Sequence, residues 1–390
     1  MAKTATAPAE EAFRAYDASG KLISKQVVDP PPFTAGALRR AIPAHCFERS
    51  IPISFLYVAV DLSMMLGLYY LSTLIDASPF PAVVRWGVLW PLYWFFQGAV
   101  CTGIWVLAHE CGHQAFSKYG WLNDTVGFVL HTFLLVPYYS WKESHHLHHA
   151  NTGSIDRDEV FVPEVRASEK EHHASDVFEE LPVVKFLRLI FALLLGWPLY
   201  LLMNVSSHPQ DRFTSHFDPW APIFKQDQRL EVMASDAGIV AMVSLLTYLT
   251  RLHGARWFVC TYFVPYLIVN NWLVMITLLQ HTHPSLPHYK GAEWDWLRGA
   301  LATVDRSFGF LDYFFHHIAD THVAHHLFSQ IPHYHAEEAT RAIIPVLKGY
   351  YAKDNRNALL ACFADYSACR FVVRGNDIKG ESSKAFWYRP

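Results

Sequence analysis

Residues 86–113, WGVLWPLYWFFQGAVCTGIWVLAHECGH, hold the pattern that decides the fold. Residues 86–108 carry no charged side chain. A helix rises about 1.5 Å per residue, so this segment would extend about 34 Å, enough to cross a hydrocarbon layer about 30 Å thick. It leads directly into His109 and His113, which would lie on one face of the continuing helix. This order predicts a membrane-spanning helix that carries potential metal ligands just beyond the bilayer.

The composition favours a membrane protein. The chain has 390 residues, of which 52% are hydrophobic and 17% charged, and its mean hydropathy is +0.11. Charged residues usually make up about 25% of a soluble protein, so the polar surface is scarce here. A net charge of -3 leaves no basic surface for a nucleic-acid partner. Six cysteines stand singly without a CxxC pair, which fits a reducing, cytosol-facing protein better than a disulfide scaffold.

Histidine is the unusual residue of this chain, with 23 copies. The clusters HECGH (109–113), HHLHH (145–149) and HVAHH (322–326) have spacings that place two or three imidazoles on one helix face. Imidazole suits zinc, iron, copper and nickel, and about four histidines per ion indicate a pair of metals. Open coordination positions would fit oxygen-activating iron better than a closed structural zinc site. The eight expected ligands are His109, His113, His145, His148, His149, His322, His325 and His326.

The membrane topology follows from the condition that all three clusters lie on one side of the bilayer. The number of crossings between any two clusters must then be even or zero. The apolar stretches 121–139 and 186–203 are therefore expected to lie in the interface or to re-enter. The expected fold is an all-α integral membrane protein with interfacial helices and a cytosolic helical cap that holds the dimetal site. Its four spans, in two hairpins, are expected at about 53–75, 86–108, 237–252 and 257–279.

Three regions are expected along the chain. Residues 1–50 should form a cytosolic N-terminal arm, residues 51–345 the catalytic domain, and residues 346–390 a cytosolic C-terminal tail. The first residues lack the apolar core of a secretory signal and are too acidic to resemble a transit peptide. The last region holds eight Lys or Arg, which is typical of a cytoplasmic tail.

The pattern HxxxH, HxxHH, HxxHH resembles the three histidine boxes of the membrane fatty acid desaturase and hydroxylase superfamily. The flanking strings are similar to those of the delta-12 (omega-6) oleate desaturases of the endoplasmic reticulum, from about residue 41 to residue 351. Omega-3 relatives usually have Asp after the first histidine and Gln-Ile in the third box, where this chain has Glu110 and Val323-Ala324. The matching strings are AIPAHCFERS (41–50), AHECGHQ (108–114), NTG (151–153), DEVFVP (158–163), LQHTHP (279–284) and DTHVAHHLFS (320–329).

This resemblance implies an activity and its cofactors. Two non-haem iron ions, with O2 as co-substrate and two electrons from a partner, would remove two hydrogens from an oleoyl group to give a linoleoyl group. Residues 51–345 would be the fatty acid desaturase domain, multi-pass in the endoplasmic reticulum membrane with cytosolic termini, and its substrates would be phospholipid acyl chains. The sequence has no His-Pro-Gly-Gly string typical of cytochrome b5, so that protein and its reductase are expected as external electron donors. A related acyl-lipid hydroxylase or an omega-3 (delta-15) desaturase remains an alternative.

Other polar residues are candidates for supporting roles. By resemblance, His281 at the end of the last span is the expected ninth ligand, with His283 as the alternative. Asp61 lies within the first span, where it is either functional or satisfied by a helix neighbour. The aromatic string at 386–388 resembles retrieval signals of reticulum enzymes or aromatics at a membrane interface. Residues that could orient ligand histidines are His316, His317, Asp158 and His146, while surface or loop positions are expected for His172, His173, His208, His216 and His253.

A rival interpretation is a zinc protease within the membrane. Residues 109–113 satisfy HExxH, in which Glu110 would be the general base. This interpretation leaves six clustered histidines without a role and does not explain their spacing. About two irons per chain would favour oxidative chemistry, and one zinc would favour proteolysis. A metal transporter would need histidines inside the spans, whereas these histidines stand at the ends of the spans.

Overall fold

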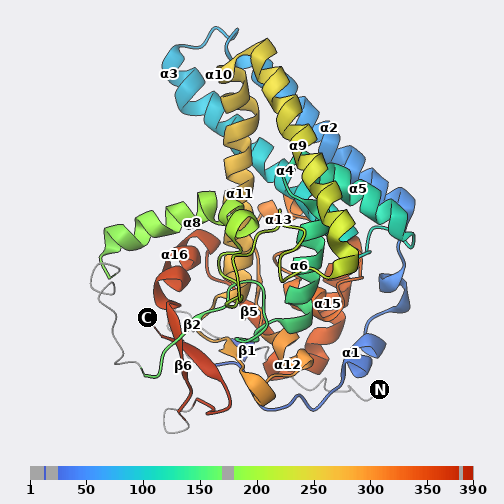
Figure 1. Cartoon of the computed structure of the whole chain (residues 1–390), viewed down its shortest axis with the longest axis vertical. Helices are drawn as coiled ribbons and strands as arrows, with labels where there is room; N and C mark the ends of the chain where they lie inside the picture. The colour runs from blue at the N-terminus through green and yellow to red at the C-terminus, as the bar shows by residue number, and fades with distance from the viewer. Residues whose placement is uncertain (1–12, 15–24, 169–179, 377–380, 390) are drawn as a thin grey trace, which may run out of the picture.

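The computed structural model describes residues 13–14, 25–168, 180–376 and 381–389. Figure 1 shows a stalk of long helices above a wider body. Short helical segments extend two of the stalk helices: α3 (Ala82–Val84) and the π-turn η2 (Arg85–Leu89) precede α4, and α10 (Ala255–Phe258) and the π-turn η4 (Val259–Phe263) precede α11. The stalk consists of α2 (Ile51–Ile75), α4 (Trp90–Gly112), α9 (Arg229–His253) and α11 (Val264–His281).

Two prolines explain why π-turns interrupt the stalk helices. Pro91 and Pro265 lie in the first turn of α4 and α11, directly after η2 and η4. A proline in a helix lacks the N–H that would continue the hydrogen-bond ladder, and its ring crowds the preceding turn. The wider π-turn absorbs this local misfit and lets the helix continue.

Five helices in the described part of the chain are long and apolar enough to cross a membrane. The four predicted spans fall on α2, α4, α9 and α11 with their short extensions. The fifth helix, α8 (Pro182–Met203), covers the apolar stretch for which an interfacial position is expected. In Figure 1, α8 extends sideways from the junction of stalk and body, across the direction of α11.

Helix α4 is the centre of the packing. It packs against α2, α11 and α5 (Gly120–Phe133). A Cβ atom on Gly98 would lie 2.2 Å from the side chain of Ile268, so the absence of a side chain lets α4 and α11 approach closely. Helix α2 has the opposite character, because Leu56 and Leu66 on it are more than half exposed. Such an apolar surface fits contact with lipid hydrocarbon.

The body contains the remaining helices and two small sheets. The sheet orders are β1-β5-β4 and β2-β6-β7-β3, and β7 is antiparallel to both of its neighbours. The strands are β1 (Phe13–Arg14), β2 (Glu164–Val165), β3 (Pro287–His288), β4 (Asp305–Arg306), β5 (Ala352–Asp354), β6 (Phe371–Arg374) and β7 (Phe386–Arg389). The helices are α1 (Ala35–Ala41), α6 (Tyr138–Asn151), α12 (Trp296–Leu301), α13 (Leu311–Phe314), α14 (His322–Leu327), α15 (His333–Leu347) and α16 (Ala358–Ala368), with 3-10 turns η1 (Ala44–Phe47), η3 (Gln226–Gln228), η5 (Gly291–Glu293) and η6 (Lys348–Tyr350).

The C-terminal segment, for which the sequence predicts a tail, is folded onto the body in its described part. Ala361 and Cys362 of α16 belong to the main apolar core. In β7, Trp387 and Tyr388 are 1% and 5% exposed, so this aromatic string is neither an exposed signal nor an interfacial belt. The number of basic residues did not predict this packing. The large apolar side chains between them bury enough area to hold the segment against the body.

Candidate metal centre

Four helices bring nine histidines together where the stalk meets the body. Helix α4 ends at the first cluster and α11 ends at His281, so both carry imidazoles at their lower ends. Helix α6 supplies the second cluster and α14 the third. The nine histidines that converge are the eight expected ligands and His281.

The first group contains five histidines whose nitrogen atoms lie within 4.8 Å of one another: His109, His113, His145, His149 and His325. Three of their Nε2 atoms form a triangle, with separations of 3.0 Å (His109 to His145), 3.2 Å (His109 to His113) and 3.0 Å (His113 to His145). A neutral imidazole nitrogen either donates or accepts a hydrogen bond, so three mutually adjacent nitrogens cannot all be paired correctly. A cation at their common point resolves this conflict, since metal–nitrogen bonds of about 2.1 Å at right angles place the nitrogens about 3.0 Å apart.

The second group contains His148, His281, His322 and His326. The first, second and fourth of these offer nitrogens within 4.8 Å of one another. The Nε2 atom of His322 lies 3.0 Å from that of His281 and 3.0 Å from that of His326. The two groups are neighbours, because the rings of His149 and His326 stack with their centroids 4.1 Å apart. The donor set therefore fits two adjacent metal ions held by five and four imidazoles.

Polar partners orient the ring nitrogens that face away from the centre. The Nδ1–H of His148 donates to Asp158 at 2.6 Å, and this carboxylate also accepts from the backbone N–H of Gly153 at 2.8 Å. A hydrogen bond at Nδ1 leaves Nε2 free to bind a metal. Thr152, which the sequence analysis did not single out, lies 3.1 Å from Nδ1 of His326 through its hydroxyl. Its sequence signals are its place three residues after the second cluster and its membership of the string NTG (151–153).

Burial keeps these imidazoles neutral. Desolvation, followed by repulsion from neighbouring histidines, holds the pKa of His145, His149, His322 and His326 well below the ordinary value. The same causes lower the pKa of His325 to about 3, and its Nε2 has no hydrogen-bond partner among the described residues. Neutral imidazole is the form that binds a metal, so the environment selects the ligand state.

The other histidine candidates lie outside the two groups. His283 accepts from the backbone N–H of Ser285 at 3.1 Å and approaches Asp354 at 3.4 Å. His317 pairs with Asp320 at 3.1 Å, and His146 is exposed. His283 thus belongs to a separate polar cluster, and neither of the other two contacts a ligand nitrogen through a described hydrogen bond.

Asp61 has a partner distant in sequence. Its carboxylate lies 2.7 Å from Nε2 of His316, and both side chains are buried. The pair sits against Gly103 of α4, where a Cβ atom would come within 2.4 Å of the carbonyl oxygen of Phe314. Asp61 is therefore satisfied across the packing of α2 on the body and not by a neighbour on its own helix.

Two further histidines are buried: His216, for which a surface or loop position was expected, and His131, for which the sequence made no prediction. His216 lies in the loop between α8 and α9, one of the two expected positions, but it is fully buried and not on the surface, 2.9 Å from the hydroxyl of Ser144. Contacts with α6 bury His216, and no local sequence pattern predicts this burial. His131 is also fully buried, with Nε2 3.3 Å from the carbonyl oxygen of Trp105. His208 is partly exposed and His253 exposed, as expected, whereas His172 and His173 lie outside the described residues.

The contacts of Glu110 are not those expected of the general base of a zinc protease. It is buried, and its carboxylate accepts a hydrogen bond from the backbone N–H of His333 at 2.8 Å. The contact anchors the start of α15 beside the first cluster. With seven further histidines gathered around the two of HExxH, the protease interpretation has no support in the geometry.

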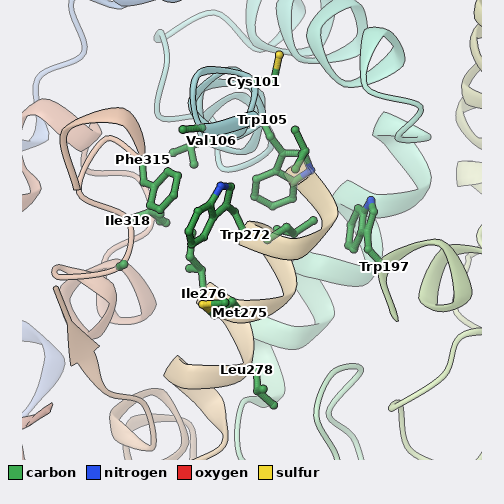
Figure 2. Packing of buried hydrophobic residues seen from close by; sticks show 14 of the residues in the cluster. Cys101, Trp105, Val106, Trp197, Trp272, Met275, Ile276, Leu278, Phe315 and Ile318 are labelled. Carbon is green, nitrogen blue, oxygen red and sulfur yellow. The ribbon is translucent and has the colours of Figure 1, made fainter. Parts of the chain in front are cut away.

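A cavity of about 510 Å³ leads from the two histidine groups toward the surface. Its inner end is lined by His109, His145, His148, His281 and His322. Figure 2 shows Trp272 on α11 with Trp105 and Trp197 beside this helix, and Trp105 and Trp197 also line the cavity. Its outer end is lined by charged residues of α8 and the body, including Arg166, Lys185, Arg188, Arg370 and Glu164. A long apolar chain with a charged end fits this succession of surfaces.

Apolar helices of spanning length and two buried groups of histidines compatible with metal binding indicate a class: membrane enzymes that oxidise their substrates at a histidine-rich site. The sequence model for "Fatty acid desaturase" matches residues 86–357, and the chain belongs to this family.

The relatives span nearly the whole chain. "Delta(12) fatty acid desaturase FAD2" of Calendula officinalis is 50% identical over 362 residues, which cover 93% of this chain and 92% of that one. "Delta(12)-acyl-lipid-desaturase" of Punica granatum is 52% identical over 360 residues, covering 92% and 91%. "Oleoyl-12-hydroxylase FAH12" of Ricinus communis is 49% identical over 359 residues, covering 92% and 91%.

Proposed function

We propose that this protein is a delta-12 fatty acid desaturase that converts oleoyl to linoleoyl groups with O2. The observation that carries the proposal is the pair of buried histidine groups whose members line one mostly apolar cavity. Identity of about 50% to relatives named for delta-12 desaturation supports the position of the new double bond.

Two iron ions are the metals we propose for the site, one in the group of five histidines and one in the group of four. Bound iron would supply the oxidising power that opens an unactivated C–H bond, which no protein acid or base can do. Residues of the chain orient the histidines that would hold the iron. Asp158 fixes the tautomer of His148, and the hydroxyl of Thr152 lies at Nδ1 of His326. The aromatic and aliphatic walls exclude water from the acyl chain and decide which carbon stops at the metals.

The substrate we propose is an acyl chain of a membrane phospholipid. Lys185 and Arg188 lie on α8 at the outer end of the cavity, next to exposed Phe186 and Leu187. Apolar side chains of this kind support a position of α8 in contact with the acyl region of the lipid, from which long cations could reach toward its phosphate. The double variant Lys185→Glu with Arg188→Glu should raise KM for phospholipid vesicles about tenfold with little change in kcat. Lys290→Glu, at an exposed pair on the body, is the control and should leave KM unchanged.

For the membrane arrangement, we propose four spans on α2, α4, α9 and α11, with α5 and α8 in the interface and both termini cytosolic. The support is that all three clusters meet in one site, which requires an even number of crossings between them. Residues 51–345 would be the desaturase domain, preceded by an arm and followed by a cytosolic segment. Three relatives of this chain carry "endoplasmic reticulum" in their names, which supports that membrane as the location. Cytochrome b5 and its reductase are the proposed electron donors.

Expression in yeast, followed by gas chromatography of its fatty acids, tests the activity. Linoleate should appear with the wild-type chain and should be absent with His149→Ala, while both proteins remain in the membrane fraction. The similarity to the Ricinus hydroxylase makes a hydroxylated product the second candidate. Such a product, or a delta-15 double bond, would overturn the proposal, as would an active purified enzyme without iron.

A further inference from the structure

A second cluster of metal-ligand side chains lies outside the nine histidines. It joins His45 and Cys46 of η1 to His335 and Glu338 of α15. One nitrogen, sulfur or oxygen atom from each of these residues lies within 4.8 Å of the others. The two histidines and the glutamate are partly or largely exposed, whereas Cys46 is fully buried. The string 41–50, which marks the resemblance of this chain to desaturases, thus contributes two residues that the proposed reaction does not use.

Contacts without any metal already hold the two elements together. The hydroxyl of Tyr334 accepts a hydrogen bond from the backbone N–H of Ser50 at 2.8 Å. Phe47 of η1 meets Phe328, in the turn between α14 and α15, edge to face with ring centroids 5.9 Å apart, and η1 itself packs against α15. The four ligand side chains are therefore brought together by the fold and need only small side-chain movements to close on an ion.

The separations are close to those around a tetrahedral ion. Nε2 of His45 lies 2.8 Å from a carboxylate oxygen of Glu338, a hydrogen-bond distance, and Sγ of Cys46 lies 3.8 Å from the same nitrogen. Zinc bonds of about 2.0 to 2.3 Å at tetrahedral angles place an N–O pair about 3.3 Å apart and an N–S pair about 3.5 Å apart, so each separation would change by about 0.3 to 0.5 Å when the side chains close on the ion. His335 and Glu338 are three residues apart on α15 and so share one helix face. The rings of His45 and His335 lie with centroids 5.4 Å apart.

We propose that these four residues form a structural zinc site. One thiolate, two imidazoles and one carboxylate are a ligand set of the softness that zinc prefers, and four protein ligands leave no open position for catalysis. Burial, followed by the charge of Glu338, raises the pKa of Cys46 to about 11, and a bound cation would take the place of the thiol proton. The ion would clamp the N-terminal segment to α15, whose first backbone N–H holds Glu110 beside the first histidine cluster.

Cobalt substitution in the purified full-length chain tests the site. Co²⁺ bound through a thiolate produces a ligand-to-metal charge-transfer band, and neither histidine group includes a cysteine among the described residues. The wild-type chain should show this band at one equivalent of Co²⁺, and competition should show that Zn²⁺ displaces it. Cys46→Ser should abolish the band, and His335→Ala should weaken cobalt binding at least tenfold. Glu337→Gln, an exposed change on the same helix, should behave as wild type.

The iron content separates this site from the proposed catalytic centre. Elemental analysis should find the same iron in His335→Ala as in the wild type, together with less zinc. A wild-type chain without the thiolate band, or a band that persists in Cys46→Ser, would overturn the proposal. If Cys46→Ser does not fold, the half-buried His335 still decides the matter, because cobalt binding by His335→Ala equal to that of the wild type would refute the site.

Discussion

The change Asp158→Asn removes one negative charge beside the second histidine group without altering the shape of the side chain. Asp158 is 4% exposed and lies 2.6 Å from Nδ1 of His148. A hydrogen bond to a charged group contributes about 1.5 to 3 kcal/mol, against about 0.5 to 1.5 kcal/mol for a neutral one. The loss of about 1 to 2 kcal/mol corresponds to a metal affinity about 5 to 30 times lower. Outer partners of metal-bound histidines commonly show an effect of about 10 to 100 times.

A chelator titration of the purified protein measures this effect. Iron in the group of His148 should leave at a chelator concentration about tenfold lower in Asp158→Asn than in the wild type, and linoleate formation in yeast should fall in parallel. Asp156→Asn is the matched control, because Asp156 is exposed and contacts the backbone N–H of Gly291 instead of a histidine. An Asp158→Asn protein that kept its iron and its activity at wild-type levels would refute the orienting role.

The remaining predictions concern packing, a buried ion cluster and acid stability. Gly103→Ala should lower the free energy of unfolding by about 1 to 3 kcal/mol, because its Cβ would meet backbone, and thermal melts should show no such loss for Gly67→Ala, where the space is open. Arg306→Ala, which leaves two buried carboxylates without this partner, should cost about 3 to 5 kcal/mol, and a melting temperature within one degree of the wild type would contradict the structure. Burial lowers the pKa of His216 from 6.5 to about 4. Between these two pH values the unfolded chain binds more protons than the folded chain, so the free energy of unfolding falls as the pH is lowered. The slope is at most about 1.4 kcal/mol per pH unit. His216→Gln should flatten this dependence of melting temperature on pH, and an unchanged slope would exclude the titration of His216 as its cause.

Much of the candidate site could be predicted from short-range patterns. The three clusters lie on helices whose pitch places residues three and four apart on one face, so each cluster could be recognised without knowing what packs on it. The apolar stretches of α2, α4, α9 and α11 could be recognised because bilayer thickness sets a minimum helix length.

Other features depend on contacts that no local pattern encodes. Asp61 pairs with His316 across 255 positions of the chain, whereas the sequence predicted either a functional role or a partner on the same helix. The C-terminal segment carries the charge pattern of a tail, yet Trp387 is buried because β6 and β3 flank β7. The burial of His216 likewise depends on where α6 lies.

The amino-acid sequence by itself determined the long apolar helices and the eight clustered histidines, because helical periodicity and hydrophobic length act over a few turns of one segment. The tertiary structure alone decided that the histidines divide into groups of five and four, and it placed His281, the preferred candidate from the resemblance, and not His283 in the second group. It also decided that His45 and Cys46 meet α15. These outcomes depend on how close helices from distant parts of the chain approach, which is set by packing at positions such as Gly98 and Gly103.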